Sequence, residues 1–461
     1  MAPPRRAVDR FGGWEEGYAG MKNPLRTLLA IGAIAAVAAA CSSSATPAVS
    51  APSGTSTPSV APSVAPPVAP VTLQMWGRAD LQAFLPAVVD AFNANHTNVQ
   101  VKLTLIPDDQ VVQKFTAAAA GGTGPDIVSV DLATVASYAQ NGWFSDITDK
   151  ANALTYKSTL SPSHLALATV NSKIYALPFT ADVSVLNYNK DLFTKAGLDP
   201  NKPPTTWAEI QADATAIRKL GGTTYGFYFS GACAGCMAFT FLPFTWANGA
   251  DVLSGTGANV KPTISPNPQL KSALEFFHTL WTSGVVDPEA KTDTGTDQFG
   301  PFSSGNVGMY IQGTFPLASL KKDHPNINWG ATVIPGTTSG SAAFTGGDSI
   351  ALTKQSDAHA AEAWTALSWM TDAGQKVLAQ QGVLPTRSDI AASDYAAQDP
   401  RLAVFANALK VGHTPNVTIV SQLFYDGNGP WGALVYDAIF NGNIDAAMQT
   451  CQTKMEKLLN P

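Results

Sequence analysis

The sequence predicts an α/β protein made of two lobes, each with a mostly parallel sheet flanked by helices. The length of 461 residues is the first observation, because a chain of this size exceeds what one hydrophobic core usually serves. The second is that segments with strand-like alternation take turns with segments of helical spacing, which is typical of βαβ units. The third is a strand, a polar connector holding Thr180 and Asp182, and a second strand between Ile174 and Tyr188, as expected where a chain crosses between two bodies.

The first 41 residues have the composition of an export signal, and we expect residues 1–20 not to be translated because Met21 offers a better start. Two basic residues, Lys22 and Arg26, precede an uncharged stretch that is too short to span a membrane as a mature helix. The stretch ends in three alanines and Cys41, which resembles a lipoprotein box whose cysteine becomes the lipidated first residue. An ordinary secretory signal is the alternative, and both interpretations predict export.

Residues 42–70 contain neither charged nor aromatic side chains and are rich in Ser, Thr, Ala and Pro. Such a segment cannot bury enough apolar surface to order itself. We therefore expect a disordered tether that holds a folded body off the membrane.

The first lobe opens with an alternating strand at 71–76, followed by apolar residues at helical spacing from 81 to 92. Further strands are predicted at 99–106 and 126–130, with a helix between them that the glycine-rich stretch 121–125 ends. In an open sheet of this kind, ligands bind beyond the carboxyl ends of the strands. Three side chains fall at such ends in the sequence: Trp76, Arg78 and Asp131.

The segment that contains the crossing runs from Ile174 to Trp207 and reads IYALPFTADVSVLNYNKDLFTKAGLDPNKPPTTW. It resembles the carbohydrate-binding branch of the extracellular solute-binding proteins of ABC importers, the branch that includes maltose-binding protein. The same family's patterns are found over nearly all of the exported chain, from about Val71 to Leu459. The matching strings are Pro125-Asp126 to Gly142-Trp143, PFSSGNVGMYIQGTF at 301–315, Gly346 to Ala351, Leu384 to Arg387, Trp431, and Phe440-Asn441-Gly442.

The resemblance implies the two-lobed fold of periplasmic binding proteins (type II) with several hinge crossings. It also implies a division of the chain into a leader and lipoprotein signal at 1–41, the tether at 42–70, a first lobe at 71–178 plus 344–390, and a second lobe at 179–343 plus 391–461.

A sugar site needs aromatic planes for the faces of the ring and carboxylates or amides for its hydroxyls. The family places an acidic or polar ligand contact where this chain has Asp182, and an aromatic where it has Phe315, although that position is usually tryptophan. The ligand-binding residues expected on this basis are Trp76, Arg78, Asp131, Asp182, Phe239, Trp246, Asn248, Phe315, Asp348 and Trp431.

Each of these residues also has a structural explanation. The aromatic residues can belong to the core, Asp131 and Asp348 can cap a neighbouring helix or turn, and Asp182 can be a solvated hinge residue. Arg78 is more often a salt-bridging residue, and the same holds for Arg387.

Two of the cysteines form a Cys-x-x-Cys pair, Cys233 and Cys236, for which a local disulfide is the expected state in an exported protein. A redox site lacks a thioredoxin-like context, and a zinc site would need two further ligands that the sequence does not offer nearby. Cys451 is expected to be a buried thiol. No metal and no cofactor are predicted.

The composition argues against two other classes of function. A net charge of −6 with 13% charged residues gives no electrostatic reason for a nucleic-acid partner. An exported glycan hydrolase would need two carboxylates flanking the scissile bond, whereas few glutamates follow Cys41 and no GxSxG, HExxH or Walker string is present. The alternative within the same fold is a non-sugar solute.

The expected function is therefore that of a monomeric binding protein, not an enzyme. It would be anchored to the outer face of the cell membrane through Cys41, would close its two lobes around a sugar, and would deliver that sugar to ABC permease subunits.

Overall fold

The computed structural model describes residues 70–460 except 297–299, 315–316, 318–319 and 321–322. These residues belong to one compact unit that begins at Pro67. The predicted signal, Cys41 and the tether up to residue 69 lie outside the described residues, and so does Phe315.

The first lobe is built on an eight-stranded sheet in which β1 pairs in parallel with β2 and β3, and β14 enters antiparallel between β3 and β6. As predicted, Leu73 and Met75 of β1 are buried on one face of the sheet. Its strands are β1 (Val71–Arg78), β2 (Val99–Ile106), β3 (Ile127–Asp131), β6 (Leu177–Val183), β14 (Ser341–Leu352) and β15 (Leu384–Pro385), with β13 (Ile334–Pro335) and β16 (Gly412–His413) pairing along β14.

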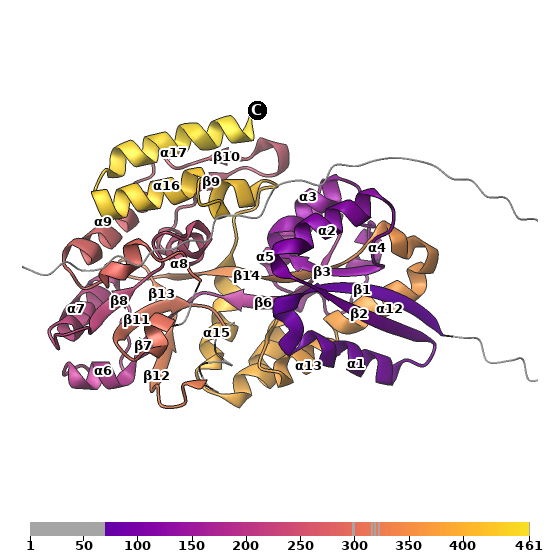
Figure 1. Ribbon diagram of the computed structural model, residues 1–461, viewed down its shortest axis with the longest axis horizontal. Helices are drawn as coiled ribbons and strands as arrows, with labels where there is room; N and C mark the ends of the chain where they lie inside the picture. The colour runs from indigo at the N-terminus through magenta and orange to yellow at the C-terminus, as the bar shows by residue number, and fades with distance from the viewer. Residues whose placement is uncertain (1–69, 297–299, 315–316, 318–319, 321–322, 461) are drawn as a thin grey trace, which may run out of the picture. The chain divides into compact units, whose positions relative to one another are not determined.

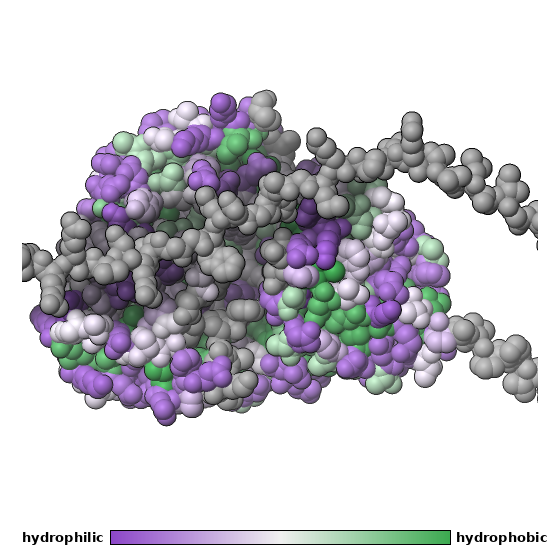
Figure 2. All heavy atoms as spheres, in the orientation of Figure 1, coloured by the Kyte–Doolittle hydropathy of each residue, from purple (hydrophilic) through white to green (hydrophobic). Residues whose placement is uncertain are grey.

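Helices cover this sheet and enclose a core that includes Leu85, Phe92 and Leu367. The helices are α1 (Leu85–Asn95), α2 (Asp108–Ala120), α3 (Val135–Gln140), α4 (Thr148–Asn152), α5 (Pro162–Leu167), α12 (Ala360–Thr371), α13 (Gly374–Gln380) and α14 (Ser388–Ile390), with the hairpin β4 (Thr169–Val170) and β5 (Lys173–Ile174). Figure 2 shows apolar residues gathered over the region where Figure 1 places β1 and β2, the edge of the sheet.

The second lobe contains a four-stranded sheet, β12 (Trp329–Thr332), β7 (Val185–Asn189), β11 (Val307–Gln312) and β8 (Tyr225–Tyr228), in that order. Only β8 and β11 are parallel in it, because β7 pairs antiparallel with both β11 and β12. This sheet is therefore mixed, whereas a mostly parallel one was expected. β7 enters this sheet directly from β6 of the first sheet through Ser184, and it runs opposite to both of its neighbours.

The remaining elements pack around the second sheet (Figure 1). They are α6 (Lys190–Lys195), α7 (Trp207–Arg218), α8 (Ala234–Trp246), α9 (Pro268–Thr282), α10 (Gly300–Ser303), α15 (Leu402–Ala408), α16 (Pro430–Tyr436) and α17 (Ile444–Leu459), and the hairpin β9 (Leu253–Ser254) and β10 (Lys261–Pro262).

Short turns of 3-10 or π type connect these elements. They are η1 (Ala79–Ala83), η2 (Leu132–Thr134), η3 (Lys157–Thr159), η4 (Gly257–Asn259), η5 (Pro288–Lys291), η6 (Lys354–His359), η7 (Ala391–Tyr395), η8 (Ala396–Gln398), η9 (Leu409–Val411), η10 (Ser421–Tyr425) and η11 (Asp437–Asn441).

The lobes are joined where β6 passes through Ser184 into β7 and where β14 runs the opposite way beside it (Figure 1). Ser184 and Phe344 exchange two hydrogen bonds here, of 3.0 and 2.8 Å. Gly347 is required at the same place, because its φ is +113° and an added Cβ would lie 2.1 Å from the carbonyl oxygen of Thr180. The exact lobe boundaries remain a prediction.

The crossing differs from the sequence prediction in one respect. Thr180 and Asp182 were expected in an irregular connector, but they belong to β6, and the chain leaves the regular strand only at Ser184. The cause is pairing with a distant segment, since β14 matches Gly346 to Asp182 and Asp348 to Thr180.

Candidate ligand-binding site

The edge of the first sheet from which the chain crosses to the second lobe carries a buried charge network. β1 and β3 end at this edge, and β6 leaves it toward β7. Asp348 is fully buried, and its carboxylate accepts a 2.6 Å hydrogen bond from Nη2 of Arg78 and a 3.0 Å hydrogen bond from the Ser129 hydroxyl. The ion pair holds Arg78 at this edge of the sheet, where its side chain is 22% exposed.

Two further carboxylates surround the same guanidinium. Asp80 pairs with Arg78 at 3.2 Å, and Asp131 faces Asp348 in the register of β3 and β14. Burial alone would lower the pKa of Arg78, but Asp348, Asp131 and Asp80 outweigh burial and raise it. Three carboxylates and one guanidinium therefore converge on one sheet edge.

Asp131 caps a short helical turn and also keeps part of its side chain exposed. One of its oxygens accepts the backbone N–H of Ala133 at 2.8 Å and caps η2, which is the alternative that the sequence left open. The side chain is nevertheless only half-buried. Burial raises the pKa of Asp131, Arg78 opposes the increase, and Asp348 adds to it. Trp76 is half-buried against the cluster that contains Phe115 and lies on the same face of β1 as Arg78.

Asp182 fastens the crossing strand to the second lobe. One carboxylate oxygen accepts both the backbone N–H and, at 2.8 Å, the hydroxyl of Thr314, just after β11. Gly313 makes this contact feasible, because an added Cβ there would lie 2.0 Å from that oxygen. Asp182 is therefore engaged by the protein itself, and a ligand would share the carboxylate with Thr314.

The aromatic cluster that follows β8 divides in two. Phe239 of α8 is half-buried beside Phe344, with ring centroids 5.4 Å apart, next to the crossing. Trp246 donates its ring N–H to Asp251 at 3.0 Å. Asn248 accepts the backbone N–H of Thr337 at 3.0 Å. The ring of Trp246 also lies beside Phe344, with centroids 5.8 Å apart, so Phe239 and Trp246 are both brought to the crossing, whereas Asn248 fastens a loop of the second lobe.

Trp431 is placed in the core, contrary to its expected contact with a ligand. It has no exposed surface and packs against Phe241 and Phe424, with centroid distances of 5.8 and 5.6 Å. Burial of α16 against α8 requires an apolar side chain here, so in this structure Trp431 is a core residue. Arg387 is likewise structural, because it pairs with Asp372 and Asp389.

Tyr425 is the residue that sequence reasoning missed. It ends η10 in the second lobe, and burial raises its pKa, with the Asp131 carboxylate of the first lobe adding to the increase. An added Cβ at Gly235 would lie 3.6 Å from its ring. The only sequence signal is that Phe424-Tyr425 precedes a turn, Asp426 to Gly429, which places an aromatic at a loop end.

Cys233 and Cys236 are joined by a disulfide at the start of α8. Cys451 is a free thiol that is buried, and burial raises its pKa to about 12. Within the described ranges, no group of three or more potential metal-ligating side chains is assembled.

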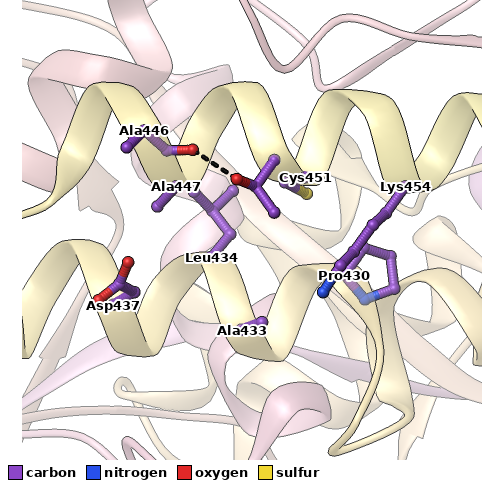
Figure 3. Close-up of a pocket in the computed structure, with 9 residues that line it drawn as sticks. Pro430, Ala433, Leu434, Asp437, Ala446, Ala447, Cys451 and Lys454 are labelled. Atoms are coloured by element: carbon purple, nitrogen blue, oxygen red, sulfur yellow. Dashed lines mark hydrogen bonds between the residues drawn. The ribbon is translucent and has the colours of Figure 1, made fainter.

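A groove of about 280 Å³ lies between α16 and α17, and Cys451 is one of the residues that line it (Figure 3). Its walls are mostly small or apolar and include Ala433, Leu434 and Ala447. None of the predicted ligand-binding residues lines it, so we place the candidate site at the crossing edge instead.

Comparisons with known proteins show the family of the chain. The family model of the bacterial extracellular solute-binding proteins matches residues 77–377. A binding protein of Brucella abortus is 27% identical over 328 residues, which are 71% of this chain and 78% of that protein. The multiple sugar-binding protein of Streptococcus mutans is 24% identical over 315 residues, 66% of this chain and 71% of that protein.

The fold has counterparts among solved structures. The cyclic alpha-maltosyl-1,6-maltose binding protein of Arthrobacter globiformis superimposes with a TM-score of 0.73 at 24% identity, over 85% of this chain and 99% of that one. Over the described part of the chain, no helix has the length and apolar character needed to cross a membrane. The family match runs from the end of β1 past β14 and so includes strands of both sheets and the crossing. The chain therefore belongs to the bacterial extracellular solute-binding proteins.

Proposed function

We propose that this protein is the exported solute-binding component of an ABC importer and that it captures a mono- to oligosaccharide between its two lobes. The observation that carries this proposal is the first-lobe edge at the crossing, where the half-buried Asp131 carboxylate, Arg78 and Trp76 lie at the ends of β3 and β1. A carboxylate accepts sugar hydroxyls strongly, and an aromatic ring covers the C–H face of a sugar.

The proposed contacts divide by lobe. On the first lobe, Asp131 would accept hydroxyl protons, Arg78 would donate from its fixed position, and Trp76 would supply an apolar face. On the second, Tyr425 and Phe239 would cover the sugar. Asp348 has no exposed surface, so its proposed role is to hold Arg78 in place.

The capture mechanism follows from contacts made by both lobes. A ligand that touches both lobes favours the closed form by its difference in affinity between the two forms. Closure would bend the chain near Ser184 and at β14, and the permease would recognise the closed form. The lipid anchor at Cys41 and the tether would keep the binding protein near that permease.

The relatives support a carbohydrate as the ligand. The Streptococcus mutans protein is named for binding multiple sugars, and the Arthrobacter globiformis protein for a cyclic maltosyl-maltose. Structures with the same fold have been solved with tagatose, mannobiose, mannotriose and maltose. These sugars form a rational panel for a first screen.

A thermal-shift screen of the exported domain, from about Val71, tests the proposal. A ligand present at a hundred times its Kd should add about 2.7 kcal/mol to the apparent free energy of unfolding. We expect at least one sugar of the panel, extended to other oligosaccharides, to raise Tm. If only polyamines, amino acids or inorganic ions do so, the carbohydrate assignment is wrong while the binding function stands.

A second measurement addresses catalysis. After long incubation with the bound sugar, chromatography should recover that sugar unchanged. A hydrolysis product would overturn the assignment as a binding protein.

A further inference from the structure

The disulfide occupies a junction of three segments in the second lobe. It follows β8 closely, and the turn that carries it is held by backbone hydrogen bonds from Gly231 to Ala290 and from Ala232 to Asp293, of 2.8 and 2.9 Å. Within the turn, the N–H of Cys236 donates to Sγ of Cys233 at 3.1 Å. The first turn of α8 is therefore fastened both to itself and to the segment around residue 290.

Gly295 packs directly on the disulfide. An added Cβ at Gly295 would lie 2.5 Å from Sγ of Cys236 and 3.1 Å from Sγ of Cys233, and its φ is +78°. Its N–H donates to one oxygen of Asp293 at 2.8 Å, and the other oxygen accepts the Tyr228 hydroxyl at 3.0 Å. No space for a side chain separates this loop from the sulfur atoms, so the loop and the disulfide determine each other's position.

The other side of the same turn supports the proposed ligand-binding wall. The ring of Tyr425 lies against Gly235, between the two cysteines, where an added Cβ would be 3.6 Å from Cδ1. Gly432 of α16 approaches Ala234 of the same turn, with 3.0 Å between an added Cβ and the Cβ of Ala234. The turn is thus the surface on which Tyr425 and the start of α16 rest.

We propose that the Cys233–Cys236 disulfide positions the second-lobe wall of the ligand site, so that the oxidised protein binds its ligand more tightly than the reduced protein. The inference rests on the proposed function. A phosphine reductant would supply two electrons, become a phosphine oxide with the oxygen of water, and leave two thiols. Sulfur atoms without a bond between them need a larger separation. In a turn packed by Gly295 on one side and Tyr425 on the other, that separation displaces the wall.

The first arm of the test needs no ligand. Amide hydrogen exchange of the exported domain is compared with and without the phosphine, in a Cys451→Ser background so that only the paired cysteines change. We expect faster exchange at 231–237, 290–296 and 421–432 after reduction, and unchanged exchange in β1 and β3. Equal exchange at 421–432 in both forms would overturn the proposal.

The second arm measures Kd by calorimetry for the panel sugar that binds tightest. Reduction and the Cys233→Ser/Cys236→Ser pair should each weaken binding by about tenfold, with circular dichroism confirming that the domain stays folded. An unchanged Kd would make the disulfide purely structural. If the oxidised protein binds no sugar at all, the proposed function fails, and the exchange experiment still decides the positioning role.

A matched pair of glycine variants separates displacement of the turn from loss of the covalent bond. Gly295→Ala adds a methyl group against the sulfur atoms and should weaken binding as reduction does. Gly249→Ala is the control, because its φ of +79° imposes a similar backbone penalty but nothing lies within 4 Å of the added Cβ. We expect Gly249→Ala to bind like the wild type, and equal losses in both variants would contradict the positioning role.

Discussion

The two edges that form the candidate site are held in place by different means. On the first lobe, Asp131 and Asp348 face each other in the register of β3 and β14, and Arg78 at the end of β1 is held by a hydrogen bond to the buried Asp348 carboxylate. On the second lobe, Tyr425 ends a short irregular turn and rests on a disulfide-bonded helix start. The first edge therefore depends on protonation and charge, whereas the second depends on a covalent bond and on close packing.

The comparison predicts whether a substitution at each edge lowers the stability of the protein or its affinity for the ligand. A regular sheet positions its side chains by register, so damage to one residue there should appear mainly as lost stability. An irregular turn has no register, so damage to its support should appear mainly as lost affinity. Variants on each edge and a pH series test this difference between stability and affinity effects.

The largest effect is expected from Asp348→Asn. The change removes the buried negative charge that balances Arg78, and breaking a buried ion pair on one side costs about 3–5 kcal/mol. Because Asp80 still faces Arg78 at 3.2 Å, we expect the lower end of that range. Urea unfolding provides the measurement. Asp445→Asn, which breaks an exposed pair with Lys271, serves as the control and should leave the midpoint almost unchanged.

Acid should destabilise the first edge through His164. This residue of α5 has no exposed surface and donates from Nε2 to the Thr180 carbonyl at 3.0 Å, while Nδ1 accepts from Ser161. Burial lowers the pKa of His164 to about 4 from 6.5. The neutral form is thus favoured in the folded state, and the stabilisation is present above pH 6.5 and lost as the pH falls toward 4.

The difference in pKa corresponds to about 3 kcal/mol of unfolding free energy between pH 6.5 and pH 4. Urea unfolding at a series of pH values, compared with His164→Gln, measures it. The glutamine amide can still donate to Thr180 but does not titrate, so the variant should show a shallower loss. If the unfolding free energy falls equally with pH in both proteins, His164 is not the cause of the loss in acid.

Asp131→Ala sharpens the comparison because Asp131 belongs to the first edge but is half-exposed. We expect a small change in stability and a loss of affinity of about ten- to a hundredfold, since an unpaired sugar hydroxyl in a closed site costs about 1–3 kcal/mol. Calorimetry with the tightest panel sugar is the measurement. Asp182→Ala should lose affinity and also release Thr314, so only that variant should lower Tm as well.

The smallest effect is expected from Tyr425→Phe. The ring and its contact with Gly235 remain, and only the hydroxyl is lost, so Kd should rise by less than about tenfold. Tyr425→Ala removes the ring and should cost more. If the phenylalanine variant weakens binding as much as the alanine variant, the hydroxyl rather than the apolar face makes the contact, and the description of the second edge as a packed wall is wrong.

Local signals in the sequence predicted the elements well. The strand at 71–76 and the helix around 81–92 are both present. Thr206 and Glu209 stand at capping-box spacing: the Thr206 hydroxyl accepts the N–H of Glu209 at 3.2 Å, and the Glu209 carboxylate accepts the N–H of Thr205 at 2.7 Å. Capping depends on neighbours in the chain, so it can be predicted to within a residue.

Contacts between distant segments could not be predicted in this way. Thr180 and Asp182 were expected in a connector because they are polar. They lie instead in β6, which pairs with β14, and Asp348 of β14 bonds to Thr180 across a sequence separation of 168 residues. Trp431 was expected at the site from the family resemblance, and only packing shows that its ring is fully buried.

The sequence by itself determined the two-lobed α/β class, the crossing segment and the charged residues at the ends of β1 and β3, because periodicity, turn residues and strand ends are properties of short stretches of chain. Tertiary structure alone decided that Asp348 lies buried beneath Arg78, that Asp182 is shared with Thr314, and that Trp431 is fully buried in the core. These outcomes depend on which face of one segment meets which face of another, and burial and pairing between distant segments are set only when the whole chain has folded.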